Sequence, residues 1–175
     1  MSEPGDALAT AEGGEDLSME DAGIREFLGF QLARERYALP LSTVREIVRL
    51  PAVTEVPRSP EEVMGVISVR GTVTTLIDLR RKLRMPEQEV GPLTRVLLVD
   101  RGNEVIGLLV DAVLQVFRLR EDEVELASVL GSEASAYVMG IGRPGTSAVK
   151  VERAHVVDDD ILILLDPLGL LKAYG

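Results

Sequence analysis

Few side chains in this sequence are suited to catalysis. Its 175 residues include one histidine, His155, and no cysteine, which excludes thiolate nucleophiles, Cys-bound zinc and disulfides. Asp158, Asp159 and Asp160 are consecutive, whereas a calcium loop spaces its acids as Asp-x-Asp-x-Asp-Gly. We therefore expect His155 in a surface loop and the three aspartates in a solvated turn. The same residues predict no metal site, no cofactor and no enzymatic activity.

Two other patterns offer weak alternatives. Gly140-Ile-Gly-Arg-Pro-Gly145 superficially resembles a phosphate-binding loop, but neither Lys-Ser/Thr nor a helix start follows it. A small hydrolase using Asp78, Asp166 or His155 is the remaining enzymatic alternative. Because the two aspartates occupy equivalent places in an internal repeat described below, one structural role used twice explains them better.

The arginines are better candidates for binding than for catalysis. Arg70 lies in a strand-like run, where its guanidinium either contacts a partner protein or bridges the sheet to a carboxylate such as Asp78. Arg80-Arg-Lys82 with Arg84 precedes Pro86 and forms the strongest basic cluster. That cluster is either a solvated helix end or an electrostatic docking surface.

The acidic residues are concentrated at the amino terminus. The chain has 29 Asp and Glu against 19 Lys and Arg, a formal charge of −10, and a pI near 4.7. Residues 1–22 hold seven acids and no base, so residues 23–175 carry 22 acids against 19 bases. We expect a disordered acidic tail over 1–22 and a folded domain over 23–175. The acidity argues against nucleic-acid partners, and the absence of ~18 consecutive apolar residues argues against membrane insertion.

Short strands must position these residues. Apolar runs rich in β-branched residues alternate with turn residues, a pattern typical of small antiparallel sheets. A short helix is also expected after Ser59, because Pro60, Glu61 and Glu62 suit a first helical turn. The expected elements are a hairpin over 27–41, a strand over 44–50, a helix over 60–64, strands over 65–71 and 72–78, a helical turn over 79–84 and a hairpin over 95–110.

The pattern restarts near residue 95. Moving residues 27–50 by 69 positions aligns them with residues 96–119, with six identities in 24 pairs. Later landmarks recur in the same order, since Gly65 corresponds to Gly140 and Asp78 to Asp166. The second copy spans 26 positions between its landmarks and the first spans 13, so about 13 extra residues lie within 144–160. The repeat predicts two small all-β barrels, sequential or interleaved, that pack against each other.

Two segments carry a family resemblance. Gly65-Val-Ile-Ser-Val-Arg-Gly-Thr-Val-Thr-Thr-Leu-Ile-Asp-Leu-Arg80 resembles the G-V-x-N-L-R-G-x-x-x-P-x-x-D-L-R signature of the CheW family, the coupling proteins of bacterial chemosensory arrays. Val105-Ile-Gly-Leu-Leu-Val-Asp111, with Val113 and Val116, is similar to the family's V-G-x-x-V-D-x-V-x-x-V segment. The resemblance covers about residues 25–172. Departures from it are Ser68-Val69 in place of Asn-Leu, Thr75 in place of Pro, and an extra stretch around 147–160.

The resemblance implies a non-enzymatic adaptor with an all-β fold of two pseudo-symmetric, SH3-like, five-stranded barrels. Its partners would be the cytoplasmic tip of a methyl-accepting chemoreceptor and the regulatory domain of a CheA-type histidine kinase, in the cytoplasm at receptor arrays on the inner membrane. A CheW-like scaffold of a non-motility pathway, controlling development or surface appendages, is the alternative. The family's receptor-facing or structurally critical positions fall on Val44, Glu46, Gly65, Arg70, Gly107 and Val116.

The composition of residues 1–22 generates a prediction. Deleting this segment should leave the midpoint of thermal unfolding unchanged, because an acidic segment interleaved with Gly, Ala, Ser and Thr has few large apolar residues to contribute to a core. Differential scanning calorimetry of the full and truncated chains measures this. Loss of cooperative unfolding in the truncated chain would show that the segment is part of the fold.

Overall fold

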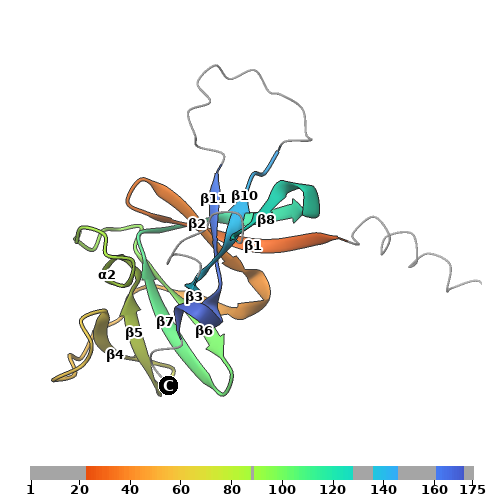
Figure 1. The fold of residues 1–175 in the computed structure, drawn as a ribbon. Helices are drawn as coiled ribbons and strands as arrows, with labels where there is room; N and C mark the ends of the chain where they lie inside the picture. Colours follow the sequence, from red (N-terminus) through yellow and green to blue (C-terminus); the bar gives the residue numbers. More distant parts are fainter. Residues whose placement is uncertain (1–22, 88, 128–135, 146–160, 172–175) are drawn as a thin grey trace, which may run out of the picture.

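The computed structural model describes residues 23–87, 89–127, 136–145 and 161–171, which form two β-sheets with a few short helices (Figure 1). An all-β fold with short helices is therefore confirmed. One sheet has six strands. In spatial order it contains β8 (Ala112–Arg120), β1 (Ile24–Leu32), β2 (Glu35–Pro40), β11 (Leu162–Leu165), β10 (Val138–Gly142) and β9 (Val124–Leu126). The expected count of five is wrong for this sheet, because the short strand β9 also pairs with β10.

The other sheet has the expected five strands. In spatial order it contains β3 (Val44–Val48), β6 (Arg95–Arg101), β7 (Glu104–Val110), β5 (Thr72–Asp78) and β4 (Val63–Val69). Short helical segments connect or follow the strands, namely η1 (Leu41–Thr43), α2 (Leu79–Lys82), η2 (Glu121–Glu123) and α3 (Pro167–Leu170). None of the helices in the described ranges is long and apolar enough to span a membrane.

Each sheet contains a hairpin from the other half of the chain. The β1–β2 hairpin precedes β3, yet β1 pairs antiparallel with β8 and β2 pairs parallel with β11. The β6–β7 hairpin instead completes the sheet of β3, β4 and β5, through an antiparallel β3–β6 pair and a parallel β5–β7 pair. The two sheets are therefore interleaved along the sequence, and neither consists of one continuous segment.

The internal repeat appears directly in the secondary structure. Strands β1, β2 and β3, moved by 69 positions, fall on β6, β7 and β8, so both predicted hairpins are extended as expected. The β1–β2 and β6–β7 hairpins have two-residue turns, and their first turn residues, Ala33 and Gly102, both have positive φ angles of 55° and 59°. The repeated sequence therefore makes the same hairpin twice.

Three apolar clusters hold the two sheets. One lies within the six-stranded sheet around Phe27 and Phe117, and receives side chains from all six strands. A second lies within the five-stranded sheet around Ile67 and Leu76, again with side chains from every strand. A sheet whose strands all contribute to one enclosed cluster must curl around it, so each sheet forms a small barrel, as in SH3-like folds.

The largest cluster joins the two barrels. It contains buried side chains of β1 and β2 from one sheet, of β5, β6 and β7 from the other, and Leu170 and Leu171 at the end of α3. In Figure 1, α3 is the dark blue helix between the sheets. Alternate residues of β6 face different clusters, since Val96 packs inside its own barrel and Leu97 packs between the barrels. Burial on both faces explains the almost continuous apolar sequences of these strands.

The hydroxyl of Tyr37, in the cluster between the barrels, has a raised pKa. Tyr37 stacks on Phe30 with ring centroids 6.1 Å apart, and its hydroxyl donates a hydrogen bond to Glu35. Burial, followed by that hydrogen bond and the charge of Glu35, raises the pKa of Tyr37 well above its ordinary value. The hydroxyl is therefore a neutral donor throughout the physiological pH range.

Equivalent glycines allow a close backbone contact in both barrels. A Cβ atom added to Gly65 would lie 2.2 Å from the carbonyl oxygen of Thr54, and one added to Gly140 would lie 2.3 Å from that of Glu125. Both glycines stand at an irregularity of strand register, next to β5 and β11 respectively. The absence of a side chain lets the preceding segment reach the edge of β4 or β10 and pair with it.

The helix expected over residues 60–64 is wrong. The Val63 amide donates to the Pro60 carbonyl at 3.0 Å, which completes a single turn, and β4 starts at Val63. Pairing of Val63 with Ile77 across the sheet replaces the hydrogen bonds that a longer helix would need. Predictions for residues 1–22, for His155 and for Asp158–Asp160 concern positions outside the described residues.

The glycine contact gives a stability prediction. Gly140→Ala should lower the free energy of unfolding by about 1–3 kcal/mol, because its Cβ would overlap a backbone carbonyl that cannot rotate away. For a chain of this length that corresponds to a melting temperature lower by about 2–12 °C. Gly91→Ala is the matched control, since a Cβ there meets nothing within 4 Å. Equal melting temperatures for both variants would contradict the close contact.

Candidate protein-binding site

Arg70 lies at the tip of the β4–β5 hairpin. Val69 pairs with Thr72, so Arg70 and Gly71 form a two-residue turn with φ angles of 50° and 81°. Two positive φ angles are typical of a type I′ turn, the geometry that matches the twist of paired strands. A non-glycine residue in the left-handed region costs about 1 kcal/mol. The hairpin therefore places Arg70 at its tip at some conformational cost.

The partner of Arg70 is Glu46. Arg70 Nη1 donates to Glu46 Oε2 at 2.7 Å and Nη2 donates to Oε1, which makes the pair bidentate. Glu46 lies on β3 and Arg70 follows β4, and these strands are the two edges of the five-stranded sheet. The ion pair thus joins the edges of the barrel. The prediction that Arg70 bridges the sheet to a carboxylate is therefore confirmed, but the carboxylate is that of Glu46. Asp78, the example expected from the sequence, is wrong as the partner because it lies at the opposite end of β5 and caps α2.

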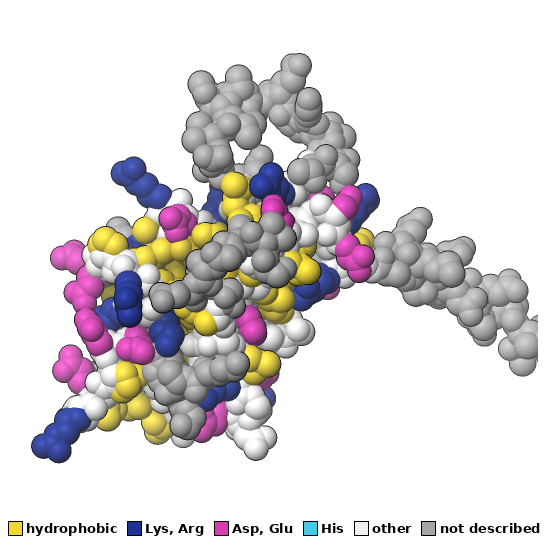
Figure 2. Space-filling model, in the orientation of Figure 1, with side chains coloured by type: hydrophobic (Ala, Val, Ile, Leu, Met, Phe, Trp, Pro, Cys, Tyr) yellow, Lys and Arg dark blue, Asp and Glu magenta, His cyan; other side chains and the backbone are white. Residues whose placement is uncertain are grey.

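Two exposed apolar side chains lie near this ion pair along the chain, although Ile47, the next residue of β3, points to the opposite face of the strand from Glu46. Ile47, next to Glu46, is 42% exposed, and Val73, two residues after the turn, is 70% exposed. The Arg70 side chain is 77% exposed. Glu46, Ile47, Arg70 and Val73 are called the β3–turn surface below. In Figure 2, apolar side chains likewise lie between charges of both signs on the visible face. Such a mixture of apolar and paired charged groups suits contact with protein.

The structure places the other predicted site residues in different environments. Val44 begins β3 and packs partly buried against the cluster between the barrels. Gly65 makes the backbone contact described above, and a Cβ on Gly107 would lie 3.0 Å from Val96, so both glycines serve packing. Val116 lies on β8 in the other sheet and is 43% exposed. Glu46 and Arg70 are therefore brought into direct contact, whereas Gly107 lies inside and Val116 lies on a separate strand.

Val116 has a counterpart in the first repeat, Ile47, which the 69-residue shift pairs with it but which was not predicted as a site residue. Moving Ile47 by 69 positions gives Val116, and the two side chains have almost equal exposure at 42% and 43%. Each lies on an edge strand of its own sheet. The repeat contains the signal that identifies this pair, because the shift that aligns residues 27–50 with residues 96–119 includes both of them.

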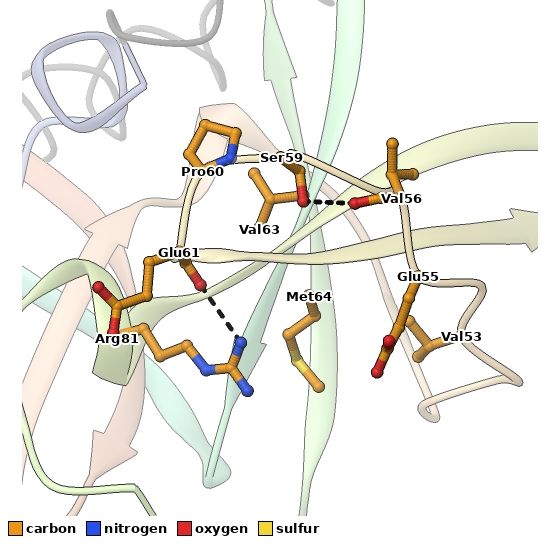
Figure 3. Close-up of a pocket in the computed structure, with 9 residues that line it drawn as sticks. All are labelled: Val53, Glu55, Val56, Ser59, Pro60, Glu61, Val63, Met64 and Arg81. Carbon is orange, nitrogen blue, oxygen red and sulfur yellow. Dashed lines mark hydrogen bonds between the residues drawn. The ribbon is translucent and has the colours of Figure 1, made fainter.

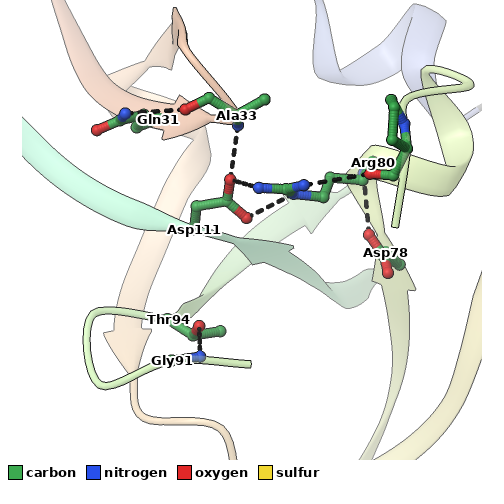
Figure 4. A network of polar contacts seen from close by, with 8 residues as sticks. Gln31, Ala33, Asp78, Arg80, Gly91, Thr94 and Asp111 are labelled. Carbon is green, nitrogen blue, oxygen red and sulfur yellow. Dashed lines mark hydrogen bonds and ion pairs between the residues drawn. The ribbon is translucent and has the colours of Figure 1, made fainter. Parts of the chain in front are cut away.

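Arg80 of the basic cluster is buried and serves the fold. Its Nε donates to Asp111 Oδ1 at 2.7 Å, its Nη2 donates to Asp111 Oδ2, and its Nη1 donates to the Pro86 carbonyl (Figure 4). Asp111 Oδ2 also accepts the amide hydrogen of Ala33 at 2.6 Å. Because Ala33 is in the turn of the β1–β2 hairpin, one carboxylate connects α2 of the five-stranded barrel to a hairpin of the six-stranded barrel.

Two further members of the cluster, Arg81 and Lys82, are also engaged in ion pairs. Arg81 Nε lies 3.3 Å from Glu87 and 3.6 Å from Asp78, and Lys82 lies 3.7 Å from Glu62. Neither sequence-based interpretation holds for the cluster as a whole, because Arg80 is not solvated and most of its positive charge is balanced within the molecule. Tertiary contacts decide this, and sequence spacing does not show them.

The two aspartates of the hydrolase alternative have the same structural role. Asp78 Oδ1 accepts the amide hydrogen of Arg80 at 2.9 Å, and Asp166 Oδ1 accepts that of Leu168 at 3.0 Å. Each carboxylate caps a four-residue helix that follows the parallel strand of its sheet. Among the described residues, no group of three or more His, Asp or Glu is arranged to hold a metal ion.

Comparison with known proteins identifies the family. Residues 26–174 match the CheW-like domain. The chain belongs to the CheW family. Chemotaxis protein CheW of Klebsiella aerogenes is 32% identical over 155 residues, which is 86% of this chain and 91% of that protein. Protein FrzA of Myxococcus xanthus is 32% identical over 117 residues, 67% of this chain and 73% of that protein.

A solved CheW structure has the same fold. The crystal structure of the scaffolding protein TtCheW from Thermoanaerobacter tengcongensis matches with a TM-score of 0.71 and 26% identity, over 86% of this chain and 94% of that chain. This CheW-like chain is thus a member of a family of chemotaxis adaptor and scaffold proteins. Its CheW signature ends at Arg80 and its second CheW-like segment contains Asp111, so the two quoted motifs meet at the buried ion pair.

The Arg80–Asp111 pair gives a second stability prediction. Asp111→Ala should lower the free energy of unfolding by about 3–5 kcal/mol, because it removes the carboxylate from a guanidinium whose side chain is 7% exposed. Urea denaturation measures this. Asp100→Ala is the control, since the Asp100–Arg45 pair is exposed and should contribute less than about 1 kcal/mol. A loss for Asp111→Ala no larger than for the control would contradict the structural role.

Proposed function

We propose that this chain is a non-enzymatic adaptor that links the cytoplasmic tips of methyl-accepting chemoreceptors to the regulatory domain of a CheA-type histidine kinase. It would act in the cytoplasm, at receptor arrays on the inner membrane. The observation that carries the proposal is the match to the CheW-like domain over residues 26–174, together with a TM-score of 0.71 to a scaffolding protein. The capping roles of Asp78 and Asp166 also favour a binding function over hydrolysis.

The β3–turn surface is the contact that we propose for a partner. An exposed ion pair contributes only about 0–1 kcal/mol to folding, so stability alone gives little reason for a bidentate arginine in a strained turn. The fixed guanidinium does, however, offer donors of defined direction, and Ile47 on β3 and Val73 on β5 add exposed apolar side chains to the same barrel. Val116 would contribute a second apolar contact from β8, while Val44, Gly65 and Gly107 would maintain the shape of the supporting strands.

A second candidate is a CheW-like scaffold of another chemosensory pathway, one that controls development or surface appendages. The similarity to FrzA, a relative not named as a chemotaxis protein, favours keeping this candidate. Both candidates predict a kinase partner. Measuring binding of the chain to the receptors and kinases of each chemosensory pathway encoded in its own genome distinguishes the two candidates. The chain should bind most tightly to the receptors and kinase of the pathway in which it acts.

Arg70→Ala tests the proposed surface. The melting temperature should change by only a few degrees, as for a surface change of about 0.5 kcal/mol. Binding to a CheA-type regulatory domain or to a receptor tip should weaken at least about tenfold, a loss typical of a residue central to an interface. Isothermal titration calorimetry and thermal unfolding on one preparation measure both quantities.

Arg84→Ala is the matched control for that experiment. Arg84 is also exposed and also has a positive φ, 56°, but it follows α2 instead of joining the edges of the barrel. It should retain normal binding. Normal binding by Arg70→Ala would remove Arg70 from the proposed contact, and failure of the unaltered chain to bind either partner would overturn the proposed function.

A further inference from the structure

A concave surface lies at the other end of strand β4 from Arg70. A cavity of about 390 Å³ is lined by the segment before β4, by its first residues Val63 and Met64, and by Arg81 of α2. Arg70 follows the last residue of this seven-residue strand, and a strand rises ~3.3 Å per residue, so the two surfaces are separated by roughly 20 Å. The cavity is therefore distinct from the β3–turn surface.

Aliphatic side chains form part of the lining of this cavity, alongside polar ones. Val53, Val56, Val63 and Met64 line it, and Val56 is 42% exposed. In Figure 3, Met64 lies between Glu55 on one side and Arg81 on the other. The volume is near the lower end of the ~300–1,000 Å³ usual for ligand pockets. That size fits one or two side chains of a partner better than a large cofactor.

The charges around the cavity do not cancel. Arg81 is already placed between Glu87 and Asp78, and its Nη1 donates to the Glu61 carbonyl at 3.2 Å. The side chains of Glu55 and Glu61 are exposed, and no ion pair with another described residue involves either of them. The cavity therefore combines aliphatic side chains with two carboxylates available to a cation.

We propose that this cavity binds a protein segment in which an aliphatic side chain is flanked by Lys or Arg. The aliphatic side chain would contact Val56 and Met64, where it removes exposed apolar surface from water. The adjacent cations would approach Glu55 and Glu61 at the rim, where complementary charge favours the encounter and sets the register. The site adds a second docking point to the proposed adaptor role and relies on that role only for the identity of the partner.

A peptide titration tests the site without kinase or receptor, so its outcome is independent of the proposed function. The probe is an acetylated and amidated Lys-Leu-Lys peptide added to the isotopically labelled full chain. Saturable chemical-shift changes are expected at the amides of Val56 and Met64, but not at Arg70. Glu55→Gln with Glu61→Gln should weaken this binding about fivefold, through loss of the two charge interactions.

Three controls make the result decisive. Glu89→Gln removes an exposed carboxylate elsewhere and should bind the peptide normally. A Glu-Leu-Glu peptide should leave the cavity amides unchanged, and a Lys-Ser-Lys peptide should bind at least about fivefold more weakly because it lacks apolar area to bury. Absence of saturable shifts at the cavity, equal binding of the Lys-Ser-Lys peptide, or full affinity in the double Gln variant would each overturn the proposal.

Discussion

The exchange of hairpins between the two halves is the constraint on which the rest of the structure depends. Because β1–β2 completes the sheet of β8 to β11, and β6–β7 completes the sheet of β3 to β5, the hairpin strands are covered on both faces. One face packs within a barrel and the other packs in the cluster between the barrels. Each parallel strand pair then leads into a capped helix, so Asp78 and Asp166 are placed by the same topology.

Although the two barrels share their topology, the five-stranded barrel has charged groups that the six-stranded barrel lacks at the corresponding positions. At corresponding positions of the two capped helices, Arg80 turns inward to Asp111, whereas Leu168 is 62% exposed. The bidentate pair of Glu46 with Arg70 likewise joins the edges of this barrel. Duplicated backbone contacts at Gly65 and Gly140 maintain the shared architecture. The differences between the repeats therefore coincide with the groups proposed to bind partners or to fix the orientation of the barrels.

The sequence predicts where the hairpin strands lie along the chain, but it does not predict which strands pair with which in the two sheets. Alternating apolar runs and two-residue turns determine hairpins locally, and so the 69-residue shift identified the same hairpin twice. A repeat does not determine which hairpin joins which sheet, because the same local pattern of strands and turns is compatible with either arrangement. The same limit explains Arg70, for which Asp78 was considered and Glu46, on the far edge of the sheet, is the partner. Residues 60–64 had suitable helix-start residues, but pairing of Val63 with Ile77 prevailed over that local preference.

The interleaved connectivity also makes the molecule a covalently joined analogue of a domain-swapped dimer. A single repeat would carry a hairpin with no sheet to complete and a sheet with no hairpin, and two copies could satisfy both by reciprocal exchange about a two-fold axis. Joining the copies in one chain frees each half to change separately. The two halves differ at equivalent positions, since Arg80 is buried against Asp111 and Leu168 is exposed. The protein therefore keeps the architecture of a symmetric pair while presenting two chemically different ends.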